Sequence, residues 1–234
     1  MPPEEIAIFI DAGNFYHLAL KKMGIAEVDF DYEGFANLLL DNRPCAERGK
    51  RFYTGTIREL EGDERSKEKM SRQNALFSRI KSVGWIPKTS KLRRREETLV
   101  IDGNVERAAE LHRLGIHEIR YTRDREKGID VQLAVDLLTG AMDNRFTSAV
   151  LVSSDTDLVP AITEVRERFG RRIEYIGFSI DDPSGVPEKA TKPTATLIYR
   201  TDRQRTFVAS DLQPFVIPRT QELPLMEAPK PEGE

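Results

Sequence analysis

Cysteine, histidine and long apolar runs are scarce in this 234-residue sequence. The single cysteine, Cys45, excludes an intrachain disulfide framework and a zinc site built from cysteines. The three histidines, His17, His112 and His117, are too scattered to suggest a zinc site. No apolar run approaches the roughly 20 residues that cross a bilayer, and the opening residues MPPEE lack the basic and apolar segments of a signal peptide. We therefore expect a cytoplasmic protein that does not contact a membrane.

A strong charge of one sign is also absent. Charged residues make up 32% of the chain but sum to a net charge of −3, and hydrophobic residues supply 39%. A chain of this length and composition can bury one core, which favours one α/β domain with appendages. Because the net charge does not indicate nucleic-acid binding, local runs of charge are more informative than the total.

What the sequence does contain is an alternation of apolar strands and amphipathic helices. Strands are expected at residues 6–10, 51–57, 85–87, 149–152 and 172–178. Helices are expected at residues 32–42, 70–84, 130–142 and 158–169. Pro87 favours either an edge position or an early end for its strand. This order predicts an α/β fold, with a mostly parallel sheet covered by helices on both faces.

The alternation predicts a domain over residues 5–180. Three segments do not fit it: one lies inside this domain and two follow it. Residues 91–121 are expected to form an insertion, in which strands at 98–101 and 118–122 flank a short helix at 108–114. Residues 181–218 are expected to form a C-terminal extension that packs on the domain and adds a helix or a strand at 197–208. Residues 219–234 are rich in proline and glutamate, which predicts a disordered tail.

Acidic side chains follow two of the predicted buried strands. Asp11 comes directly after the first strand, with Asn14 three residues later, and Asp155 and Asp157 follow the strand at 149–152. In parallel sheets ligands bind beyond the carboxyl ends of the strands, so these acids share one rim if their strands are neighbours. Asp130, at the start of a predicted helix, could join them.

Several converging carboxylates require a cation. Two carboxylates about 4 Å apart repel by roughly 1 kcal/mol in water and by about 4 kcal/mol at an effective dielectric constant near 20. Oxygen ligands of this kind suit Mg²⁺ or Mn²⁺, which keep several waters and leave room for phosphate oxygens. A metal held in this way can activate water and bind a transferring phosphoryl group, so the acids indicate phosphoryl-transfer chemistry.

Each acid also has a purely structural interpretation. Ser154 or Asp155 could cap the helix that follows, and Asp157 would be favourable in the first turn of that helix. Asp11 could be a turn residue and Asn14 a helix cap. Asp130 could be an ordinary residue of a helix N-terminus.

The two acidic segments together resemble a known family. The stretches IFIDAGNFYHLAL and REKGIDVQLAVDLLTGAMDNRFTSAVLVSSDTDLVPAITEVRERFGRRIEYIGF are similar to the NYN domain of the LabA-like (DUF88) group, a branch of the PIN-like nuclease superfamily. The resemblance covers about residues 6–178 and is strongest in the D-x-x-N and K-G-x-D…S-x-D-x-D blocks. It implies a PIN-like fold and an acidic Mg²⁺ or Mn²⁺ site that hydrolyses RNA phosphodiester bonds.

The resemblance also implies which residues form the site. The catalytic set is Asp11, Asn14, Asp130, Asp155 and Asp157, and its four aspartates are the implied metal ligands. The supporting positions are Lys127, Ser153 and Asp136. Asp136 lies six residues after Asp130 on the predicted helix and so points roughly 240° away, which favours a structural role. Ser154, where the family often has glycine, is one departure from the pattern, and Leu158 in place of a frequent phenylalanine is another.

Two basic runs flank the predicted acidic site. They could neutralise RNA phosphates on either side of the scissile bond, which would make binding salt-dependent. The members of these runs are Lys88, Lys91, Arg93, Arg94, Arg95, Arg123 and Arg125. Three aromatic residues, Phe15, Trp85 and Tyr121, could stack on unpaired bases, which favours single-stranded RNA. The alternative interpretation of the first run is a solvated loop.

These observations predict a metal-dependent ribonuclease. Asp155 is favoured over Asp157 as a direct metal ligand. A homodimer is compatible with the sequence. A non-catalytic RNA-binding or regulatory module that keeps the acidic pocket fits the same residues. A phosphatase is less favoured, because only Asp11 is acidic after the first strand and the chain has no glycine-rich phosphate loop.

Overall fold

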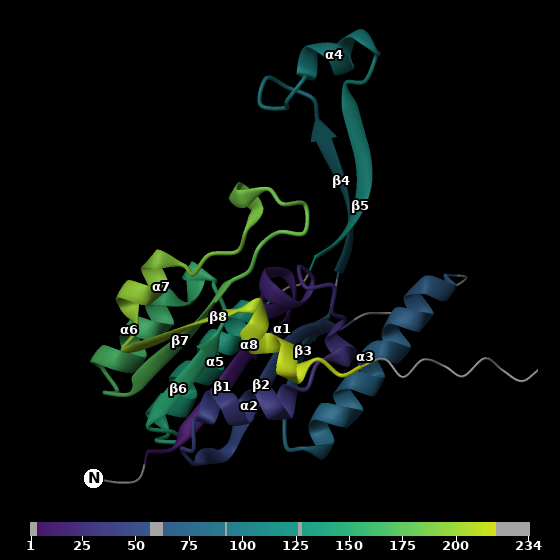
Figure 1. Ribbon diagram of the computed structural model, residues 1–234. Helices are drawn as coiled ribbons and strands as arrows, with labels where there is room; N and C mark the ends of the chain where they lie inside the picture. Colours follow the sequence, from purple (N-terminus) through teal and green to yellow (C-terminus); the bar gives the residue numbers. More distant parts are fainter. Residues whose placement is uncertain (1–3, 57–62, 92, 126–127, 219–234) are drawn as a thin grey trace, which may run out of the picture.

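The centre of the fold is a six-stranded sheet with the strand order β3-β2-β1-β6-β7-β8 (Figure 1). The computed structural model describes residues 4–56, 63–91, 93–125 and 128–218. All five pairings of this sheet are parallel. Its strands are β1 (Ile6–Asp11), β2 (Cys45–Thr56), β3 (Ile86–Lys91), β6 (Ser148–Val152), β7 (Arg172–Ser179) and β8 (Arg203–Val208). The predicted α/β fold, and the edge position predicted from Pro87, are confirmed.

Helices cover both faces of the sheet, as Figure 1 shows. One face carries α1 (Ala12–Phe15), α2 (Tyr32–Leu40), α3 (Glu64–Ser82) and α8 (Ala209–Leu212). The other carries α5 (Ile129–Met142), α6 (Val159–Glu167) and α7 (Ala195–Arg200). Because successive strand residues point to opposite faces, Ile8 and Ile10 pack into the first core and Ala7 and Phe9 into the second. Within the described ranges, no helix has both the length and the apolar character needed to cross a membrane.

The segment at 197–208, for which the sequence predicted either a helix or a strand, forms parts of both. It contributes the end of α7 and the strand β8, which pairs with β7 from Glu174↔Arg203 to Ser179↔Val208. Residues after 180 therefore supply one edge of the central sheet.

A two-stranded antiparallel arm leaves the body of the domain (Figure 1). β4 (Arg93–Val100) pairs with β5 (Glu118–Arg125), and α4 (Ala108–Arg113) lies at the tip. The predicted pair of strands with a short helix between them is confirmed. The solvated-loop interpretation of the first basic run is wrong, because Lys88 and Lys91 lie in β3 and residues 93–95 lie in β4.

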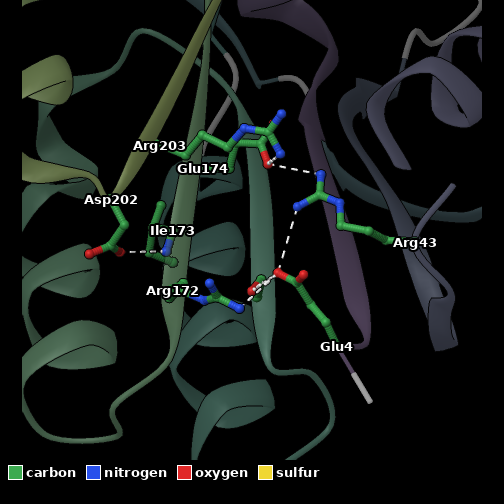
Figure 2. A pocket seen from close by; sticks show the side chains of 8 residues that line it. Glu4, Arg43, Arg172, Ile173, Glu174, Asp202 and Arg203 are labelled. Atoms are coloured by element: carbon green, nitrogen blue, oxygen red, sulfur yellow. Dashed lines mark hydrogen bonds and ion pairs between the residues drawn. The ribbon is translucent and has the colours of Figure 1, made fainter. Parts of the chain in front are cut away.

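A buried carboxylate joins the elements at the amino end of β7 (Figure 2). Glu174 is 3% exposed, and its Oε2 accepts a hydrogen bond from Arg43 Nη2 at 2.9 Å and lies 3.7 Å from Arg203 Nη1. Glu4 pairs in turn with Arg43 at 3.7 Å and with Arg172 at 3.1 Å. Because a buried charge is tolerated only when it is paired, this network fixes the loop after α2 against β7 and β8.

Candidate active site

The acidic loops predicted after β1 and β6 meet at one rim of the sheet. β1 and β6 are neighbours in parallel register. The Ser153 hydroxyl donates to Asp11 Oδ2 over 3.1 Å, and the Ser154 amide donates to Asn14 Oδ1 over 2.9 Å. Two direct hydrogen bonds thus join segments that are 140 or more residues apart in the sequence.

Asp11 and Asp155 also cap short helices. Asp11 Oδ1 accepts the Asn14 amide at 3.0 Å as the N-cap of α1. Asp155 Oδ1 accepts the Asp157 amide at 2.9 Å at the start of the 3₁₀ turn η3 (Thr156–Leu158). The capping interpretation of Asp155 is therefore correct, whereas the interpretation of Asn14 as a helix cap is wrong, because Asp11 is the cap and Asn14 lies within α1. The two caps do not compete with a ligand role, because each carboxylate oxygen has two lone pairs.

Asp11 is the most buried of the four acids. It is 7% exposed, whereas Asp155 is half-buried and Asp130 and Asp157 are exposed. Burial raises the pKa of Asp11 to about 6; the hydrogen bonds from Asn14 and Ser153 oppose this rise, and the charges of Asp130 and Asp155 add to it. The pKa of Asp130 is also raised, by desolvation first and then by the charges of Asp155 and Asp157. The four carboxylates therefore act on one another electrostatically.

These acids do not form a closed metal cage. Among the residues that the structure describes, no group of three or more His, Cys, Asp or Glu side chains lies close enough to hold a metal ion. Mg²⁺, however, is usually bound by one or two carboxylates and keeps several waters. Desolvation and, to a smaller extent, repulsion between the carboxylates raise the pKa values of Asp11 and Asp130, and a bound cation would offset both effects. An open site with oxygen ligands therefore fits Mg²⁺ or Mn²⁺.

Asp136 faces a different set of partners. Its Oδ2 accepts the Tyr53 hydroxyl at 2.9 Å and lies 3.2 Å from Lys88 Nζ and 3.7 Å from Arg51 Nη1. Tyr53 lies beside Asp11 in the register of β1 and β2. Asp136 therefore holds the strand next to Asp11 in place. Lys88 is engaged in this ion pair, and its contact with RNA stays a prediction.

Several predicted residues lie outside the described part of the structure. Lys127 is one of these, and so are the side chains of Lys91, Arg93, Arg94, Arg123 and Arg125. The backbones of the last five belong to β3, β4 and β5. Arg95 is exposed on β4, directly opposite residue 123 of β5.

The prediction that aromatic side chains stack on RNA bases is wrong for two of the three residues. Phe15 is 0% exposed and Trp85 is 2% exposed, and both belong to the core between the sheet and α1, α2 and α3. They are therefore out of reach of RNA. Tyr121 is 42% exposed on the arm, where its hydroxyl donates to Glu97 at 2.9 Å.

Tyr175 and Thr194 support the site and were not predicted. Tyr175 Oη lies 3.2 Å from Ser154 Oγ and accepts the Thr194 amide at 3.0 Å, while Thr194 Oγ1 donates to the Ser154 carbonyl at 3.2 Å. These bonds fix the peptide directly before Asp155. No local pattern could reveal them, since the partners are 21 and 40 residues away in the sequence.

Comparison with known proteins gives one family match. The family model of the NYN domain matches residues 5–196. No match was found among curated proteins. Among solved structures, a protein of unknown function from Vibrio parahaemolyticus is 16% identical, with a TM-score of 0.48 over 88% of this chain and 93% of that chain.

Proposed function

The chain belongs to the NYN domain family, a branch of the PIN-like nuclease superfamily, and we propose that it is a metal-dependent ribonuclease that cleaves single-stranded RNA. The observation that carries this proposal is the junction of the two acidic loops. There the buried Asp11 accepts a hydrogen bond from Ser153, two residues before Asp155. The LabA-like group, the cytoplasmic location and the homodimer stay predictions.

Asp11, Asp130 and Asp155 are the residues proposed to hold Mg²⁺ or Mn²⁺, with Asp157 as a further ligand or a group that orients water. The metal, when bound, supplies a Lewis acid and a water of lowered pKa. Asn14 uses its amide oxygen to accept the Ser154 N–H. Its NH₂ group keeps donors that can bind a phosphate oxygen, which would orient the scissile phosphate at the rim.

The base of the arm supports an RNA substrate. The register of β4 and β5 places Arg93 opposite Arg125 and Arg95 opposite Arg123. Arginines at these register positions would bind RNA phosphates. β5 is followed in the chain by α5, whose first turn carries Asp130. The arginines therefore lie close in sequence to an acid of the proposed site.

Purified protein is expected to cleave a 5′-labelled single-stranded RNA in Mn²⁺ and to lose this activity in EDTA. If the four arginines of the arm base each contact a phosphate, the logarithmic salt slope of binding is about −2.8, or about 50-fold weaker binding between 50 and 200 mM salt. Cleavage that persists in EDTA would contradict the metal requirement. Salt-dependent binding without cleavage would instead identify a non-catalytic RNA-binding module.

A further inference from the structure

A pocket of about 140 Å³ lies between α3 and the helical turns that follow α1. Its walls include Tyr16, Glu27, Lys69, Arg72 and Gln73. Pockets that enclose a whole drug-sized ligand measure roughly 300 to 1,000 Å³. At about 140 Å³, this pocket is smaller than that and accommodates one ring system.

Two walls of this pocket are tied to the strands that end at the acidic rim. Tyr16 begins the π-helical turn η1 (Tyr16–Leu20), which continues α1 directly. Gln73 Nε2 donates to the Gly55 carbonyl at 2.8 Å, and Gly55 lies two residues beyond Tyr53, the register partner of Asp11. The pocket therefore lies at the same end of the sheet as the acids, on the face that carries α1 and α3.

Glu27 is the group in this pocket that the fold does not explain. It lies in the 3₁₀ turn η2 (Glu27–Asp29), and burial raises its pKa to about 7. Within the described ranges its carboxyl group has no hydrogen-bond or ion-pair partner, and Arg72 pairs with Glu68 instead, at 2.6 Å. Glu27 is half-buried, so its carboxyl group is partly desolvated without a protein partner among the described residues to compensate. A hydrogen-bond donor of a ligand that enters the pocket would supply that partner.

The chemistry of the pocket matches one nucleobase better than the others. An ionised carboxylate accepts two parallel hydrogen bonds. Guanine presents two adjacent donors, N1–H and N2–H₂, on its Watson–Crick edge, whereas adenine and cytosine present one donor beside an acceptor and uracil one donor between two acceptors. The ring of Tyr16 can stack on a base, and Lys69 and Arg72 can bind the phosphate of the same nucleotide.

We propose that this pocket binds a guanine base of single-stranded RNA beside the scissile bond, with Glu27 reading the two guanine donors. This inference rests on the proposed ribonuclease function and adds a base preference to it. The same chemistry would recognise a free guanine nucleotide, so the test includes both kinds of ligand.

Glu27 gives the proposal a pH signature. The charged and titratable groups around it are Tyr16, Lys69 and Arg72 in the pocket and Tyr32 and Arg79 on the core side. Lysine, arginine and tyrosine side chains do not ordinarily change charge between pH 6 and 8. Because guanine needs the ionised carboxylate, its binding is expected to weaken as the pH falls from 8 to 6.

NMR titration of the full chain with GMP, AMP, CMP, UMP and the dinucleotide GpU tests the assignment at pH 8 and pH 6. The wild type is expected to prefer GMP at pH 8, and Glu27→Gln to weaken GMP binding about tenfold. The control Glu167→Gln, exposed on α6, is expected to bind like the wild type. GpU is expected to bind at least as tightly as GMP.

Three results would overturn the proposal. They are equal affinities for the four nucleotides, a Glu27→Gln variant that still prefers GMP, and free GMP bound more tightly than GpU. A nuclease that cleaves RNA with no preference at guanosine would overturn the base pocket and leave the ribonuclease proposal standing. If the protein binds GMP and GpU through Glu27 but cleaves no RNA, the ribonuclease proposal would be overturned and the base pocket would stand.

Discussion

The Asp11→Asn variant is expected to lose RNA cleavage and, at pH 8, to be more stable than the wild type. Asp11 is buried, and its pKa rises from 3.8 to about 6 on folding. A carboxyl group with a raised pKa favours the folded state below its unfolded pKa, and this contribution is lost as the pH rises through the folded value. At pH 8 the ionised carboxylate therefore costs about 1–3 kcal/mol, which the neutral amide avoids.

Chemical unfolding of both proteins at pH 8 and pH 5 measures this effect. The advantage of the variant should shrink at pH 5, where wild-type Asp11 binds a proton. Cleavage should fall at least about 100-fold, equivalent to roughly 3 kcal/mol of lost transition-state stabilisation. Asp143→Asn, at an exposed carboxylate paired with Arg145, is the matched control and should change neither property. A variant that keeps its activity would exclude Asp11 from the site.

The Asp155→Asn variant is expected to lose at least about 100-fold in kcat/KM with Mn²⁺, and Asp157→Asn about tenfold. Asp155 is half-buried, and its amide donates to Ser153 Oγ at 3.2 Å, whereas Asp157 is exposed. The fold should survive the first substitution, because an asparagine oxygen can still accept the amide of residue 157.

Cleavage rates over a range of Mn²⁺ concentrations, together with RNA dissociation constants, separate loss of catalysis from loss of binding. Both variants should bind RNA nearly as well as the wild type. A larger loss for Asp157→Asn would reverse the assignment of the direct ligand. Full activity in Asp155→Asn would remove this loop from the mechanism.

The apolar runs at 6–10 and 149–152 made the centre of the site predictable. Each run forms a buried strand that stops at polar side chains, and in a parallel sheet the carboxyl ends of neighbouring strands meet. The sequence left open whether the two strands are neighbours, and the pairing of β1 with β6, which brings Asp11 to Ser153, comes from the structure.

The surroundings of the acids were less accessible to prediction. Phe15 and Trp85 lie in the core, and the depth of an aromatic side chain depends on how the sheet and its helices pack together, which a base-stacking interpretation of single residues does not take into account. The ion pair between Asp136 and Lys88 joins α5 to an edge strand, which no local pattern reveals. The basic run at 88–95 gave no strand signal because its arginines depart from strand periodicity, yet it forms parts of β3 and β4.

Anomalous diffraction from crystals soaked in Mn²⁺ tests the central claim most directly. The predicted result is anomalous density among Asp11, Asp130 and Asp155 in the wild type, which is lost in crystals of Asp155→Asn. Bound Mn²⁺ at another place, or no density at this rim under conditions in which the protein cleaves RNA, would contradict it.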